Sequence, residues 1–252
     1  MKRDGATPVT AEALFGVHVP ACGECNAALD TTIEKPAKPV VRRLLEHADS
    51  TENLILSADD CVALARWLLK VGLLSAHPSA EHDHPGLQRD EDVPRLVTIR
   101  PEWLDWMPAG AIPPDGFSVF LTRRGLRGED PEPEFEQRIL LPKVILDGEN
   151  LDFMSHSFGF AGVNATIVWH PGWPIQHAQV DGGRAARIWP APGAVDFGAL
   201  PQVHPKELAF WNGAAGSTML STDQLVQAAR RPLSVESDPL LAFFGDLFEP
   251  EA

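Results

Sequence analysis

The sequence predicts an α+β protein in which an N-terminal helical region precedes a C-terminal antiparallel sheet with a few helices. Two changes along the chain lead to this expectation. Up to residue 75, apolar residues recur at helical spacing, whereas from residue 117 short apolar runs alternate with Gly, Pro and charged turns. Between them, residues 76–116 are rich in Pro, His and acids. We therefore expect a boundary that divides the chain into residues 1–77 and 78–252.

The first element is a short apolar stretch, residues 14–19, which predicts a strand leading into a turn with two cysteines. A helical region follows this turn. Asn26 is a favoured N-cap type, and apolar residues continue along one face as far as residue 45. Because proline lacks an N–H and its ring clashes with the preceding turn, Pro36 and Pro39 predict two short helices that meet near them.

The clearest helix is expected over residues 58–75. Ser57 precedes it, and Asp60 follows three residues later, which resembles a capping box. Apolar residues cover a wide face of this segment, so we expect it to lie in the core. Trp67 and Cys61 are expected to pack there as a large and a small hydrophobe.

The strand pattern begins at residue 117. Short apolar runs separated by Gly, Pro and charged turns predict strands at 117–122, 139–145, 151–158, 164–170 and 186–189. Residues 158–163 contain two glycines and suit a hairpin turn or bulge. Near the end of the chain, residues 221–231 predict a modest helix.

Charge limits the partners of this protein. The formal net charge of the 252 residues is −14, which argues against a broad basic surface that captures nucleic acid. Residues 1–75 hold 8 Lys and Arg against 10 Asp and Glu, and the remaining residues hold 13 against 25. DNA contact is therefore expected, if anywhere, in the nearly neutral N-terminal region, and a protein partner suits the acidic remainder.

Neither a membrane span nor a signal peptide is predicted. The chain has no apolar run of roughly 18 residues, and its charged N-terminus has no apolar segment. Its three cysteines are too few for a disulfide framework and fit a reducing compartment. We expect a cytoplasmic protein. The sequence also holds no nucleophile elbow, phosphate-binding loop or dinucleotide fingerprint.

The CxxC motif formed by Cys22 and Cys25 is the main candidate site. Two thiols on one turn can hold one metal ion, and tetrahedral zinc requires two further ligands. His18, four residues before Cys22, is a candidate for one of them. A redox dithiol and a pair of free thiols are the alternatives, although a redox CxxC usually heads a helix after a thioredoxin-like strand.

A second candidate cluster comprises His77, His82 and His84. The alternating imidazoles of the last two would point the same way on a strand, and Glu81 or Asp83 lies beside them. A transition-metal site is the functional interpretation of this cluster. A polar surface loop is the structural alternative.

One family resemblance adds to these expectations. The resemblance depends on five short segments of the sequence: Cys22–Asn26, Leu29–Glu34, Lys38–Pro39, Leu56–Ser57 and Trp67–Lys70. Together they resemble the second half of HNH-type nuclease modules, the zinc-knuckle branch of the ββα-metal fold found in many uncharacterised bacterial proteins. The resemblance implies that Cys22 and Cys25 are two of four structural zinc ligands and that Asn26 starts the helix beside them. It also implies DNA as substrate and Mg²⁺ or Mn²⁺ as the catalytic ion.

Two parts of the HNH pattern are missing from the given sequence. No CxxC and no Asp-His or Glu-His pair precedes Cys22, so the histidine that would activate water has no counterpart. We expect an HNH-nuclease-like protein that is inactive in this form, either truncated at its N-terminus or degenerate. The sequence does not decide whether Met1 is the true start. The alternative is a non-enzymatic, zinc-stabilised scaffold or protein-binding module.

Overall fold

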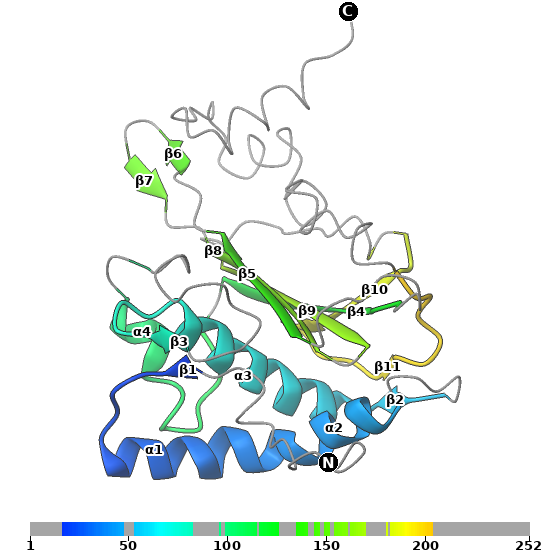
Figure 1. Ribbon diagram of the computed structural model, residues 1–252, viewed down its shortest axis with the longest axis horizontal. Helices are drawn as coiled ribbons and strands as arrows, with labels where there is room; N and C mark the ends of the chain where they lie inside the picture. Colours follow the sequence, from blue (N-terminus) through cyan, green and yellow to red (C-terminus); the bar gives the residue numbers. More distant parts are fainter. Residues whose placement is uncertain are drawn as a thin grey trace, which may run out of the picture.

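The computed structural model has an α+β fold, as predicted. It describes residues 17–47, 53–82, 96, 99–114, 116–125, 135–140, 144–146, 149–151, 154–160, 162–169, 180 and 182–203. Helix α3, Ala58–Ser75, lies against one face of a five-stranded antiparallel sheet, and the N-terminal helix packs on the other side of α3 (Figure 1).

The N-terminal helix is continuous. Segments α1 (Gly23–Leu29), η2 (Asp30–Glu34) and α2 (Lys35–Glu46) follow one another without a break and form one helix of 24 residues. The prediction of two short helices that meet at the prolines was therefore wrong. The predicted N-cap was also wrong, because the helix begins at Gly23 and its N-cap is Cys22, four residues before Asn26.

A π-helical turn and buried packing explain why the prolines do not break this helix. In η2 the N–H of Lys35 donates to the carbonyl of Asp30, so the hydrogen-bond register shifts by one residue just before Pro36. Pro36 then occupies the first turn of α2, and only Pro39 lies inside it. Both rings are exposed, while the opposite face of the helix is buried against α3 and the core. Burial of that apolar face offsets the local cost of proline.

Helix α3 matches its prediction. The Ser57 side chain accepts a hydrogen bond from the backbone of Asp60, and the Asp60 carboxylate accepts one from the backbone of Ser57, which completes a capping box. Trp67 is buried, as is Cys61. Before the helix, strand β2 (Ile55–Leu56) pairs with β11 (Val195–Asp196).

The large sheet has the strand order β10-β4-β9-β8-β5. Its strands are β4 (Phe117–Arg123), β5 (Phe135–Leu140), β8 (Met154–Phe160), β9 (Val163–Trp169) and β10 (Ala185–Trp189), and every neighbouring pair is antiparallel. The predicted hairpin is present: Phe160 pairs with Val163, and Gly162 in the turn has a φ of 77°. The sheet prediction is confirmed.

One strand prediction needs correction. The expected strand at 139–145 is divided, because β5 ends at Leu140 and β6 (Val144–Leu146) pairs with β7 (Glu149–Leu151) in a separate two-stranded sheet. The predicted helix at 221–231 lies outside the described residues. Among the described residues, no helix is both long and apolar enough to cross a membrane.

Two small elements complete the region around the N-terminal helix. Strand β1 (Val17–His18) pairs antiparallel with β3 (Glu81–His82), which follows α3. Helix α4 (Pro101–Leu104) carries Trp103, whose ring lies 4.9 Å from that of Trp169. Buried residues from both sides of the expected boundary after residue 77 belong to one hydrophobic cluster. The small elements are thus attached to the same core as the sheet.

Candidate functional site

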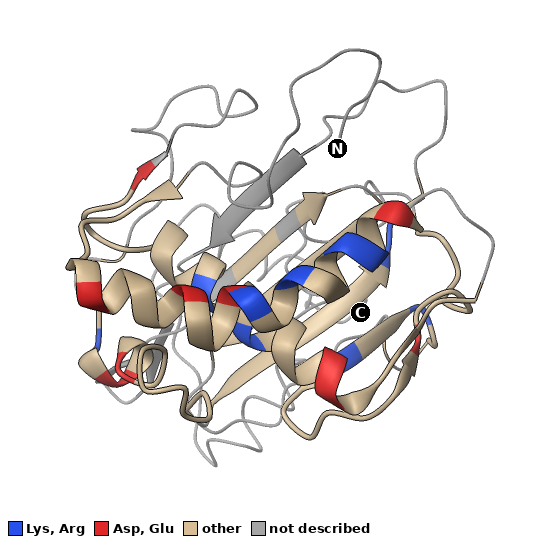
Figure 2. Ribbon diagram, turned by 90° about the horizontal axis from the view of Figure 1, so that it is seen from below, with Lys and Arg blue, Asp and Glu red and all other residues tan. Residues whose placement is uncertain are grey.

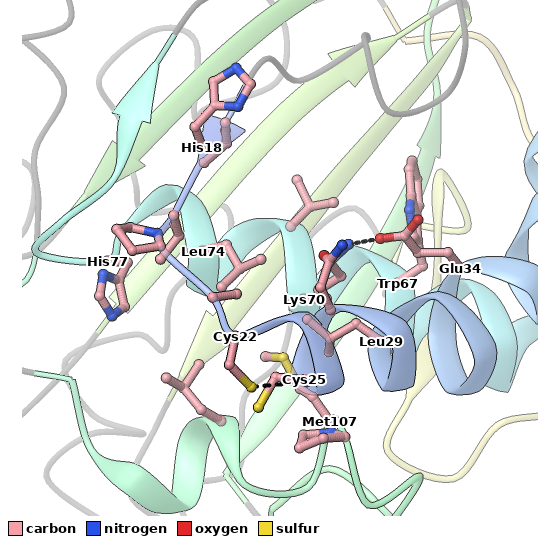
Figure 3. A pocket seen from close by; sticks show the side chains of 18 of the residues that line it. His18, Cys22, Cys25, Leu29, Glu34, Trp67, Lys70, Leu74, His77 and Met107 are labelled. Atoms are coloured by element: carbon pink, nitrogen blue, oxygen red, sulfur yellow. Dashed lines mark hydrogen bonds and ion pairs between the residues drawn. The ribbon is translucent and has the colours of Figure 1, made fainter.

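A pocket of about 640 Å³ lies beside the start of the N-terminal helix (Figure 3). Its walls come from β1 and the cysteine turn, from the N-terminal helix, from α3 and from residues 104–108. The Thr32 hydroxyl donates to the carbonyl of Met107 at 2.9 Å and ties the last of these segments to η2. Three stretches that are distant in the sequence, residues 17–34, 67–77 and 104–108, thus line one space.

The two cysteines occupy the first turn of the helix, at the pocket. Cys22 is the N-cap, with extended φ and ψ of −70° and 153°, and its Sγ accepts a hydrogen bond from the Cys25 N–H at 3.1 Å. A thiol at this position takes the place of the usual Ser or Asp oxygen. Both thiols are free and exposed. The CxxC turn therefore presents two adjacent sulfur atoms to solvent.

Electrostatics distinguish the two thiols. Hydrogen bonds from the Cys25 side chain and then from its backbone N–H stabilise the Cys22 thiolate and lower the pKa of Cys22. The same side-chain hydrogen bond, followed by repulsion from the Cys22 thiolate, raises the pKa of Cys25. Cys22 is consequently the first of the pair to lose its proton, and Cys25 acts as its hydrogen-bond donor.

Other predicted site residues line the same pocket. His18 on β1, Asn26 on α1 and His77 after α3 all lie in its wall, so two histidines predicted for separate clusters are brought together. Figure 3 shows both imidazoles set apart from the two sulfur atoms. His77 Nδ1 accepts from the Ser79 N–H at 3.0 Å, and burial lowers the pKa of His77. The described part of the chain holds no group of three or more His, Cys, Asp or Glu side chains that could bind a metal ion.

The second histidine cluster remains a prediction. The backbone of His82 pairs with Val17 in the ladder between β1 and β3, and His84 lies outside the described residues. His77 is in the turn after α3 rather than on the strand with His82. Cys61, by contrast, has the structural position expected of it: burial raises the pKa of its thiol to about 11. That thiol stays protonated and is unsuited to bind metal.

Sequence reasoning missed an ion pair in the pocket wall. Lys70 on α3 and Glu34 at the end of η2 form a salt bridge, and only 14% and 19% of their side-chain surfaces are exposed. Nearby apolar groups from Leu29, Leu74 and Met107 complete this side of the pocket (Figure 3). The two charged residues are 36 positions apart, so no local spacing links them. The π-helical turn, which sets the direction of Glu34, has no clear sequence signal.

Comparison of the chain with protein-family models, with curated proteins and with solved structures finds no match.

Proposed function

We propose that Cys22 and Cys25 bind zinc as two of four ligands in an HNH-nuclease-like protein. The observation that carries this proposal is the placement of two exposed, adjacent thiols on the first turn of a long helix, with the Cys22 thiolate already stabilised. Thiolates are the preferred ligands of structural zinc, and a turn is the usual support for a CxxC pair. The family resemblance over residues 18–77 points to the same use.

The thiol chemistry defines the pH dependence of this binding. Zinc binds deprotonated sulfur, so the Cys25 proton, which the Cys22 thiolate holds, must leave when the metal binds. Because the pKa of Cys25 is raised, zinc affinity should increase with pH in the alkaline range. Once bound, the metal would hold Cys22 and Cys25 in place at the first turn of the helix and so stabilise this wall of the pocket.

The outer face of helix α2 supports a nucleic-acid partner. Lys38 and Arg42 are exposed and lie four residues apart, and Figure 2 shows the basic positions along this helix. Their neighbours Lys35 and Arg43 form ion pairs with Asp30 and Asp60. Exposed cations one helical turn apart can contact successive phosphates of a DNA strand. The proposed DNA contact is therefore this face of the N-terminal region.

Metal analysis of the purified, reduced protein tests the zinc proposal. Wild-type protein should retain zinc after dialysis, and Cys22→Ser should lose it. Cys61→Ser is the matched control, because it removes a buried thiol that has no part in the site, and it should keep its zinc. A folded wild-type protein free of zinc would refute the proposal.

A second candidate is a zinc-stabilised scaffold without catalytic activity. The observation in its favour is that His18 and His77, the described histidines of the pocket, lie apart from the cysteine pair. An HNH nuclease requires a histidine base beside a bound Mg²⁺ or Mn²⁺ ion. Plasmid cleavage with either ion decides between the two candidates. Cleavage that disappears in His18→Ala supports the nuclease, whereas a zinc-bound protein that never cleaves supports the scaffold.

A further inference from the structure

Within the described part of the chain, the proposed zinc site has two of the four ligands that it needs. The sequence contains three cysteines, and the third, Cys61, is buried in helix α3. The given sequence therefore offers two exposed thiols, Cys22 and Cys25. Among the described residues, nothing adds a third His, Cys, Asp or Glu to the pair. Structural zinc takes four ligands, and Cys₄ is one of its commonest sets.

The surroundings of the pair leave space for another molecule. Residues 21–27 are all exposed, and a Cβ built on Gly23, between the cysteines, would have no heavy atom within 4 Å. The turn lies at one corner of the molecule, at the outer end of the N-terminal helix (Figure 1). A second protein surface can therefore approach both sulfur atoms without displacing any described residue.

We propose that a second copy of this chain completes the site, so that Cys22 and Cys25 of two chains bind one zinc ion between them. This inference rests on the zinc binding proposed above. A two-fold axis through the metal makes the contact self-complementary, because each copy offers the same CxxC turn. The four thiolates come from two identical pairs, which meets the tetrahedral requirement without any further ligand.

Charge complementarity supports this arrangement. Four thiolates around Zn²⁺ carry a net charge of −2, and each chain brings a helix N-terminus equivalent to about +0.5. Two such helices directed at one centre offset about half of that charge. Each chain is strongly acidic, with a net charge of −14, so two copies repel each other in the absence of metal. This repulsion should keep the two chains apart without metal, so the dimer should form only when zinc is bound.

Zinc stoichiometry and molecular mass, measured on the same sample of full-length reduced protein, test the bridge. We expect about half a zinc ion per chain, a dimer by sedimentation equilibrium, and a monomer after a chelator removes the metal. The Cys22→Ser variant should be monomeric with or without zinc. Substitution of cobalt for zinc should give the absorption spectrum of a metal with four sulfur ligands.

Four results would overturn the bridge. One zinc ion per monomer would place the missing ligands in the same chain and would leave the zinc proposal intact. The double variant His18→Ala, His77→Ala should keep both zinc and the dimer, and loss of zinc there would likewise indicate ligands within one chain. A dimer that persists in Cys22→Ser with chelator would show an interface independent of the metal. Zinc-free protein would refute both proposals together.

Discussion

Substitution of Gly72 by alanine tests how tightly helix α3 packs on the sheet. A Cβ at this position would lie 2.6 Å from Ile167 Cδ1 and 3.1 Å from His156 Nδ1, and both of these residues are fully buried in the sheet below. Overpacking of this kind costs about 1–3 kcal/mol. Alanine instead of glycine inside a helix returns about 1 kcal/mol. The expected net loss of unfolding free energy is therefore about 1 kcal/mol.

Urea denaturation followed by far-ultraviolet circular dichroism measures this loss, and thermal unfolding should show a Tm lower by about 2–4 °C. Gly23→Ala is the matched control, because the added methyl meets no heavy atom within 4 Å and should leave stability unchanged or slightly higher. Removal of Cδ1 by Ile167→Val should relieve the clash, so the double variant should lose less stability than the two single losses added together. If Gly72→Ala stabilises the protein as much as Gly23→Ala does, the close contact between α3 and β9 is refuted.

Two further predictions follow from the pKa shifts and the helix caps. In zinc-free protein, the rate of Cys22 alkylation should reach half its maximum at a lower pH than that of an ordinary thiol, and the rate of Cys25 alkylation at a higher pH. Cys61 should stay unreactive until the protein unfolds. Mass mapping of the labelled peptides checks this order, and equal rates at Cys22 and Cys25 would contradict it. Burial alone would raise the pKa of Asp60, but hydrogen bonds from Arg43 and Ser57 lower it. A carboxylate whose pKa is lowered in the folded state stabilises the protein above its unfolded pKa, and this contribution disappears as pH falls through the folded pKa. Asp60→Asn should therefore be less stable than wild type at neutral pH and equally stable in acid, as measured by urea denaturation at both pH values; a difference unchanged in acid would exclude the charge as its cause.

The parts of the fold that follow local rules were predictable from the sequence. The serine cap with an acid three residues later correctly located the start of α3, and alternating apolar runs between turns located four of the five expected strands. The continuous N-terminal helix was missed for a physical reason. Two prolines give a strong local signal for a break, whereas the burial of Ala37, Val40 and Leu44 that opposes it depends on a partner helix elsewhere in the chain.

The candidate site was predictable in its residues and not in its geometry. The CxxC spacing identified Cys22 and Cys25, but the sequence placed the start of the helix after them, at Asn26. The structure makes Cys22 the N-cap and brings the two side chains together. The hydrogen bond between the two thiols, followed by that from the Cys25 N–H, lowers the pKa of Cys22. The pocket itself depends on contacts such as that between Thr32 and Met107, 75 residues apart, which no local pattern encodes.

The π-helical turn of η2 has a consequence for how this protein can change by insertion and deletion. One residue of an α-helix corresponds to a rotation of about 100° and a rise of about 1.5 Å. Deletion of one residue between Asp30 and Glu34 would restore regular α-helical hydrogen bonding and leave the buried face of α2 in place. Because the wider π-helical turn already absorbs the extra residue, everything before it, including both sulfur atoms, would stay on nearly the same side of the helix axis. The same deletion in a regular α-helical stretch would instead rotate the preceding half by about 100°. The π-helical turn is therefore a place where the helix can lose one residue and still present both thiols on the same side of the molecule.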